Sequence, residues 1–452
     1  MKIIIAGAGR IGSNLAKTLS EENHEVYLIE INPDVARKAD EKIDAKVIVG
    51  SGADPDILKL AKIEQTDLVI AVTFSDEINL VICSLAAYFG SKRQVARVRT
   101  VSLSQEIREA GYRHFNIDEI INPEEVTAQA IYKTIETPGA REVGDFAEGK
   151  ILLRAFDIPE RSPFIGMKIE DFRDEDFPWP FLVIAISRNR LALIPKGDTC
   201  IESFDRIYVL LPAPSLGEFI SFVDPETKKP NKVIISGATN IGEHLARALS
   251  EDIPNIVFIE ETKSRATHIA GKFDGVRVIH GSASEKDILT ECGVEAADFF
   301  VATSNNDHSN LISAVLAKKM GAKSTIITTQ QPDYMSIVDA LDIDVIINPH
   351  MLAVEQILSV VRGKGISAVT KLLEGDAEAL EFIPEKGSAV TKAPIKEINF
   401  PKNSIVGAVC RGSEVILANG DTQIQEGEKV IVFCQQAADK KLQALFTHKT
   451  LF

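Results

Sequence analysis

The sequence predicts an α/β protein with two doubly wound parallel-sheet domains, each followed by a small α+β domain. Three observations support this prediction. The apolar run Lys2–Ala6 leads into a glycine-rich turn and then a helical segment. Apolar runs and amphipathic helical segments alternate through residues 1–123, as in consecutive βαβ units. The same order of elements begins again at residue 232.

The glycine-rich turn has the spacing of a phosphate-binding turn. It reads Gly7-Ala8-Gly9-Arg10-Ile11-Gly12, and the next apolar run ends in Glu30. Strand, GxGxxG, helix, strand and acid make up the dinucleotide-binding fingerprint of Rossmann domains. In that fingerprint the first glycine permits the turn, the second lets backbone approach a pyrophosphate, and the third lets helix and strand pack closely. Glu30 lies 30 − 12 = 18 residues past Gly12, near the usual spacing of about 20 for a carboxylate that binds ribose.

These features predict the class of ligand. The N–H groups at the start of the helix, together with the helix dipole, favour an anion. Because a carboxylate repels a 2′-phosphate, Glu30 favours NAD(H) over NADP(H). It does not separate NAD(H) from ATP or ADP, which carry the same adenosine ribose. The structural alternative is a domain that keeps the turn and has lost its ligand.

Further candidate site residues follow other strands of this domain. We expect strands at 2–6, 26–30, 47–49, 68–72, 95–98 and 118–121, and ligands of such sheets lie at the carboxyl ends of the strands. The third strand ends in Gly50-Ser51-Gly52-Ala53, where backbone can lie against an adenine ring, and the fourth ends in Thr73 and Phe74. Arg97 lies near the carboxyl end of the fifth, and both a phosphate contact and an ordinary solvated arginine remain open.

The chain reads as an internal duplication of a two-domain unit. A helix is expected from Pro123 to about Glu136, since proline and two acids open it. We place the domains at 1–123, 143–223, 232–349 and 366–450, with a polar linker at 224–231. The small domain contains alternating strands such as 151–156, 182–187 and 206–211. At one offset of 231, Gly50, Asp56, Asp67, Asp76 and Asn79 return as Gly281, Asp287, Asp298, Asp307 and Asn310. In the small domains Gly197-Asp198-Thr199 returns as Gly420-Asp421-Thr422, and Arg188 as Arg411.

The second turn differs from the first. It runs from Gly237 to Gly242, and Glu260 again follows 260 − 242 = 18 residues later. Thr239 replaces the middle glycine, so phosphate binding there is expected to be weaker or differently posed. Gly237, Gly242 and Glu260 are the candidate residues of this second site, whose occupancy is left open. His350 stands where the first copy has Glu124, and we interpret it as a solvated helix-start residue.

Composition excludes several classes of function. The net charge of −15 argues against general nucleic-acid binding and against adhesion to an anionic membrane. The five cysteines are widely spaced and suit free thiols better than disulfides or a zinc site. No apolar stretch approaches a spanning helix, and the N-terminus does not resemble a signal peptide. We therefore expect a cytoplasmic protein.

The sequence favours a sensor over an enzyme. It contains no His–acid pair with assignable roles, no His/Cys ligand cluster and no catalytic cysteine. The one Tyr-x-x-x-Lys candidate starts at Tyr132 and fails because its fourth following residue is Glu136. We interpret the nucleotide as a ligand that is sensed. The alternative is an NAD-dependent oxidoreductase with a duplicated cofactor domain. A third interpretation is a sensor that has lost its partner.

Motifs in all four domains resemble the RCK (KTN) family of regulators of potassium conductance, in particular the TrkA-type peripheral subunits of Trk potassium-uptake systems. Besides the first turn, the motifs are Ala71-Val72-Thr73 with Asp76-Glu77 and Asn79, Ala96-Arg97, Pro138-Gly139-Ala140, Phe146-Ala147-Glu148, the run 316–323, the run 405–409 and Arg411-Gly412. The departures are Thr239, which stands where the family usually has glycine, and His350.

This resemblance implies a non-enzymatic regulatory subunit that forms a homodimeric or homotetrameric ring. The ring would dock on the cytoplasmic side of an integral membrane potassium-translocating subunit of the TrkH or TrkG type. Carried over by motif, the first site comprises Gly7–Ile11, Glu30, Thr73, Phe74 and Arg97. Glu124 is expected to reach toward a neighbour's nucleotide.

Overall fold

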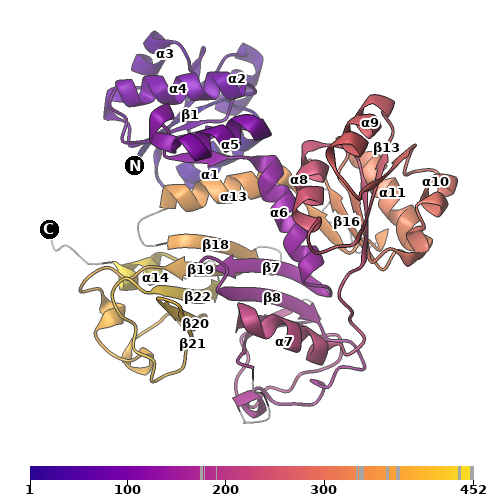
Figure 1. Cartoon of the computed structure of the whole chain (residues 1–452). Helices are drawn as coiled ribbons and strands as arrows, with labels where there is room; N and C mark the ends of the chain where they lie inside the picture. Colours follow the sequence, from indigo (N-terminus) through magenta and orange to yellow (C-terminus); the bar gives the residue numbers. More distant parts are fainter. Residues whose placement is uncertain are drawn as a thin grey trace. The chain divides into compact units, whose positions relative to one another are not determined.

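The computed structural model describes residues 1–173, 177, 179–189, 191–331, 334, 341–362, 366–372, 377–435 and 439–447 (Figure 1). These residues form two compact units. One combines 1–131 with 232–361, and the other combines 132–231 with 362–452. The first unit therefore holds both glycine-turn domains, and the second holds both small domains. The end of the fourth predicted domain, at residue 450, lies outside the described residues. The limits of the four domains stay a prediction.

The first sheet has the strand order of a doubly wound fold. Its strands are β1 Lys2–Ala6, β2 Glu25–Glu30, β3 Lys46–Val49, β4 Leu68–Ala71, β5 Arg93–Arg97 and β6 Glu119–Ile121. They pair in parallel in the order β3-β2-β1-β4-β5-β6. The order reverses between β1 and β4, and the crevice at such a reversal is where these sheets bind ligands. The predicted fold class is confirmed.

Helices connect these parallel strands. They are α1 Arg10–Glu21, α2 Pro33–Asp40, α3 Pro55–Leu60, α4 Asp76–Tyr88 and α5 Val101–Ala110. Helix α6 Pro123–Glu136 follows the last strand of the sheet. Helix α1 buries Ile11, Leu15 and Leu19 on one side, because residues at this spacing share a helix face. Helix α6 has the limits expected from Pro123 and Glu136.

The second copy repeats the same plan. Its strands are β12 Lys232–Ser236, β13 Asn255–Glu260, β14 Arg277–His280, β15 Phe299–Ala302, β16 Ser324–Thr328 and β17 Val345–Ile347, in the order β14-β13-β12-β15-β16-β17. Its helices are α8 Asn240–Leu249, α9 Lys263–Lys272, α10 Lys286–Glu291, α11 Asp307–Lys319 and α13 Pro349–Arg362.

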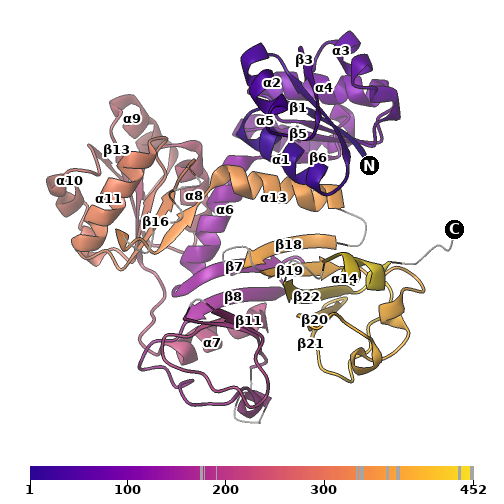
Figure 2. The same cartoon turned by 180° about the vertical axis from the view of Figure 1, so that it is seen from behind.

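Helix α13 of the second copy packs on the first copy. Ala353, Ile357 and Leu358 share one hydrophobic cluster with Ile11 and Leu15 of α1. Figures 1 and 2 both show α13 beside α1. A helix that ends the second copy thus completes the core on one face of the first sheet.

The small domains are antiparallel sheets, as expected for α+β domains. The first contains β7 Ala140–Phe146, β8 Ile151–Asp157, β9 Leu182–Arg188, β10 Leu191–Leu193, β11 Arg206–Pro212 and helix α7 Leu216–Val223. The second contains β18 Ile366–Leu372, β19 Ala377–Phe382, β20 Ser404–Arg411, β21 Glu414–Leu417, β22 Lys429–Gln435 and helix α14 Asp439–Phe446. Their strand orders are β10-β9-β11-β8-β7 and β18-β19-β22-β20-β21.

Matching contacts confirm the duplication in the small domains. The N–H of Glu170 donates to the carbonyl of Gly197 at 2.9 Å, and that of Lys396 donates to Gly420 at 2.9 Å. The two sheets also share one core, since Phe146 and Leu210 of the first belong to the same cluster as Phe433 of the second.

Candidate functional site

Two glycines of the first turn are required by close backbone contacts. Gly7 has φ +105°, a conformation that residues with a side chain rarely adopt. A Cβ on Gly12 would lie 1.8 Å from the carbonyl oxygen of Gly7. Gly9 differs, because a Cβ there would meet nothing within 4 Å. The missing side chain of Gly9 therefore leaves open space in front of the turn.

The start of helix α1 lacks a side-chain cap. Gly9 occupies the N-cap position, and no side-chain cap bond and no first-turn acid are found there in the described part of the chain. Asn32, Asp54 and Ser75 cap helices α2, α3 and α4 with their side chains, whereas α5, like α1, has no side-chain cap bond. An uncapped first turn keeps its N–H donors for an anion.

Glu30 lies against the turn. Its Oε2 accepts a hydrogen bond from the Ala8 N–H at 2.7 Å, and its Oε1 accepts one from the Asn32 N–H at 2.8 Å. A carboxylate oxygen can accept more than one hydrogen bond. Glu30 is half-buried, and each of its two oxygens accepts one of these hydrogen bonds, so further acceptor capacity remains. The side chain of Ile11, in contrast, is buried in the core, and only its backbone faces the turn.

Buried Asn79 ties the ends of two strands together. Its Oδ1 accepts from the N–H and the Oγ1 of Thr73 at 2.9 and 2.7 Å, and its Nδ2 donates to the carbonyl of Arg97 at 2.9 Å. Asp76, also buried, accepts from the N–H of Arg99 at 3.0 Å. The sequence marks both residues in two ways, by their return as Asn310 and Asp307 and by their place in a motif that resembles the RCK family, but it does not show these contacts.

Phe74 and Ala53 occupy different surroundings at the same edge of the sheet. Phe74 is 89% exposed beside Thr73. Ala53 is half-buried, and its N–H donates to Ser51 Oγ at 3.2 Å.

Arg97 is half-buried, unlike a fully solvated strand-end arginine. Its Nε is buried and has no hydrogen-bond partner among the described residues. Burial lowers the pKa of Arg97, and the neighbouring charge of Arg99 lowers it further. Glu124 does not pair with Arg97. Its Oε1 accepts instead from Arg99 Nε at 2.5 Å within the same domain. Arg97 is therefore a cation with an unused donor.

The second copy forms a cleft of about 290 Å³ at the equivalent edge of its sheet. The cleft is lined by Gly237, Thr239, Glu260 and Ser304, among others. Glu260 Oε2 accepts from the Ala238 N–H at 2.7 Å, as Glu30 does from Ala8.

Thr239 makes the second turn chemically different. Its Oγ1 accepts from the Gly242 N–H at 3.3 Å and donates to the Thr303 carbonyl at 2.9 Å. The hydroxyl therefore caps α8, where the first copy leaves α1 uncapped. This cap occupies a donor that a phosphate would use.

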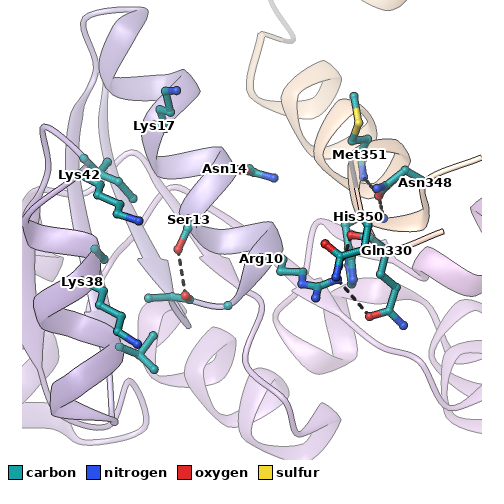
Figure 3. Close-up of a pocket in the computed structure, with 16 residues that line it drawn as sticks. Arg10, Ser13, Asn14, Lys17, Lys38, Lys42, Gln330, Asn348, His350 and Met351 are labelled. Carbon is teal, nitrogen blue, oxygen red and sulfur yellow. Dashed lines mark hydrogen bonds between the residues drawn. The ribbon is translucent and has the colours of Figure 1, made fainter. Parts of the chain in front are cut away.

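A groove of about 550 Å³ opens beside the first turn, between residues of the first copy and residues of the second copy (Figure 3). It includes Ala8, Gly9 and Arg10, so the three turn residues also face this space. Arg10 Nη1 donates to the carbonyl oxygen and to Oε1 of Gln330, at 2.9 and 3.1 Å.

His350 lies at this groove and departs from the solvated interpretation. Its Nδ1 is buried and has no hydrogen-bond partner within the described structure. Burial lowers the pKa of His350, and the charges of Arg10 and Arg97 lower it further.

All five cysteines are free; Cys200 is exposed, and the other four are buried. Over the described ranges, no group of His, Cys, Asp and Glu side chains has the arrangement of a metal site. Within the same ranges, no helix combines the length and apolar character needed to span a bilayer.

Comparison with solved structures finds the same fold. The chain matches "GsuK channel bound to NAD" with a TM-score of 0.63 and 15% identity, covering 98% of this chain and 78% of that one. It matches "Crystal structure of the GsuK bound to ADP" with a TM-score of 0.51 and 14% identity, covering 80% and 69%. At these identities the likeness concerns the fold.

Comparison of sequences identifies the family. The TrkA-N domain family matches residues 3–123 and 233–349, and the TrkA-C domain family matches 153–224 and 380–447. The Trk system potassium uptake protein TrkA of Halomonas elongata is 33% identical, over 96% of this chain and 95% of its own. That of Vibrio alginolyticus is 32% identical, over the same shares. The chain belongs to the TrkA family.

Proposed function

We propose that the first copy binds an adenine nucleotide, NAD(H), with ATP or ADP competing for the same place. The phosphates would lie on the backbone of Gly7–Gly12, and Glu30 would accept from the ribose hydroxyls. Ala53, Thr73 and Phe74 would line the adenosine, and the free donor of Arg97 would meet a phosphate.

One observation carries this assignment. Helix α1 has no side-chain cap in the described chain, whereas Thr239 caps the equivalent helix α8. An anion at α1 gains free N–H donors and open space at Gly9. At the second copy, which Gly237, Gly242 and Glu260 surround, it must first displace the Thr239 hydroxyl. We therefore expect the second site to bind nucleotide more weakly.

The nucleotide-bound chain would act as a regulatory subunit of potassium uptake, docked from the cytoplasmic side on a membrane potassium-translocating protein of the TrkH or TrkG type. Membership of the TrkA family supports this role. A ligand shifts such a partner only if it binds two arrangements of the subunit with different affinity. A homodimeric or homotetrameric ring would provide these arrangements.

The test couples binding to transport. The membrane partner is reconstituted in vesicles, and potassium flux is measured with the full chain and saturating NADH, NAD⁺, ATP or ADP. We expect flux to differ between nucleotides. Replacing Gly9 with threonine should abolish that difference, because it copies the capped turn of Thr239.

The control variant is Thr239→Gly, which leaves the first turn intact and should keep the nucleotide response. Flux that does not depend on the added chain would contradict the regulatory role. Steady turnover of NADH by the chain alone, with candidate carbonyl substrates, would instead support an oxidoreductase.

A further inference from the structure

The groove beside the first turn is basic in an acidic protein. The chain has 65 Asp and Glu residues against 50 Lys and Arg residues. Yet the sixteen residues that line the groove include four cations, Arg10, Lys17, Lys38 and Lys42, and no carboxylate. Such a concentration of one charge creates a positive potential that attracts anions.

The three lysines of the groove have no carboxylate partner among the described residues. Lys17, Lys38 and Lys42 are exposed and make no ion pair with any described residue, whereas nearby Lys46 pairs with Glu25 at 2.8 Å. Like charges that face one space repel each other, and an anion between them relieves this repulsion. The unpaired lysines therefore favour a negatively charged ligand.

Both copies contribute to the groove, which lies within one compact unit. Lys38 and Lys42 lie on the α2 side, Arg10 lies across from them, and Ser13 and Asn14 of α1 lie between (Figure 3). The second copy supplies Gln330, Asn348, His350 and Met351.

Hydrogen bonds fix the groove residues that come from the second copy. Asn348 Oδ1 accepts from the N–H groups of His350 and Met351 at 3.0 and 3.1 Å. Gln330 holds Arg10. The volume of about 550 Å³ falls within the range of small-molecule sites.

We propose that this groove binds a polyphosphate, a ligand with at least two linked phosphate groups held by Arg10, Lys17, Lys38 and Lys42. A single phosphate would engage only part of this set, because Figure 3 shows the cations spread around the groove. The ligand has two possible sources. It is either the phosphate tail of a nucleotide on the glycine turn or a separate inorganic polyphosphate. In the first case the inference rests on the proposed nucleotide site, and in the second it stands without it.

The test is calorimetric titration of inorganic tripolyphosphate into the full chain. The groove variant is Lys38→Glu with Lys42→Glu, and the matched control is Lys228→Glu with Lys229→Glu, two exposed linker lysines outside the groove. The groove variant should weaken binding by about tenfold or more, because it reverses two of the four charges that would hold the phosphates. The control should stay within about twofold of the unmodified chain. All four substituted lysines are exposed, so circular dichroism should show unchanged folding.

Two further arms identify the source. In one outcome, ATP competes with tripolyphosphate, and the groove variant loses more affinity for ATP than for ADP. The ligand of the groove is then the phosphate tail of a nucleotide. If tripolyphosphate binds with unchanged affinity in the presence of saturating ATP or NADH, the ligand is a separate polyphosphate.

A Glu30→Ala variant separates the two hypotheses. It should weaken the binding of NADH and leave the affinity for tripolyphosphate unchanged, because Glu30 does not line the groove. Loss of nucleotide binding alone therefore concerns the glycine turn. No tripolyphosphate binding to the unmodified chain, or equal losses in the groove variant and the linker control, would overturn the polyphosphate site.

Discussion

Replacing Gly12 with alanine should destabilise the first glycine-turn domain by a predictable amount. The new Cβ would lie 1.8 Å from the carbonyl oxygen of Gly7, which is 1.2 Å inside the 3.0 Å that real Cβ contacts respect. The Gly7 backbone cannot move freely, because its N–H donates to the carbonyl of Ile29 at 2.8 Å. Overpacking of this kind costs about 3 kcal/mol. Alanine returns about 1 kcal/mol of helix propensity, so a net loss of about 2 kcal/mol is expected.

Two matched variants should lose less stability than Gly12→Ala. At Gly242 the new Cβ would lie 2.5 Å from the Gly237 carbonyl oxygen, a smaller overlap of 0.5 Å with the backbone, so Gly242→Ala should destabilise its domain, but by less than Gly12→Ala does. At Gly9 the space is open, and Gly9→Ser should keep or slightly raise stability, because serine is a good N-cap.

The assay must report on the first domain itself. The single tryptophan, Trp179, lies between β8 and β9 in the other compact unit, so its fluorescence does not report on this turn. Hydrogen exchange measured by mass spectrometry resolves the opening free energy of β1 and α1 directly. Equal protection in Gly12→Ala and Gly9→Ser would refute the close-packing argument.

Three further predictions concern single side chains. Glu30→Gln should weaken NADH by about tenfold or more, since hydrogen bonds to a charged acceptor contribute about 1.5–3 kcal/mol; an unchanged calorimetric affinity would remove Glu30 from the site. Asn79→Leu should destabilise the first domain by about 1–3 kcal/mol, because Thr73 loses a buried partner; unchanged hydrogen exchange at β4 would contradict this. Because burial and Arg10 lower the pKa of His350, the folded state binds fewer protons than the unfolded state, and stability falls as the pH drops below the ordinary value of 6.5. His350→Gln should reduce the loss of stability between about pH 7.5 and about pH 5.5, and an identical loss in denaturant titrations would show that His350 does not contribute.

The sequence was sufficient for features whose causes are local. The glycine turn and its flanking strands were predictable because Gly7 and Gly12 follow an apolar run at fixed spacing. The limits of α6 were predictable because a proline and two acids open it. The duplication was predictable because one offset relates many residues, and the repeated strand order confirms it.

Features made by distant residues were not predictable. The sequence shows that Asn79 repeats, but Asn79 lies on helix α4 and its partner Arg97 lies 18 residues away on strand β5. The basic groove combines Lys17 and Lys42 with Gln330, and no local pattern relates these positions. The sequence could not decide between a buried and a solvated Arg97, because the burial of this side chain depends on which residues pack over the end of its strand. His350 was misjudged for the same reason, since its surroundings come from the first copy.

The most direct test of the account compares nucleotide binding in the two turns. Calorimetry with NADH would be performed on the unmodified chain, on Gly9→Thr and on Thr239→Gly. We expect one strong site per chain, lost in Gly9→Thr, because the new hydroxyl caps α1 as Thr239 caps α8. We also expect Thr239→Gly to strengthen a second, weaker site. Strong binding that survives Gly9→Thr would contradict the claim that the uncapped first turn holds the phosphates.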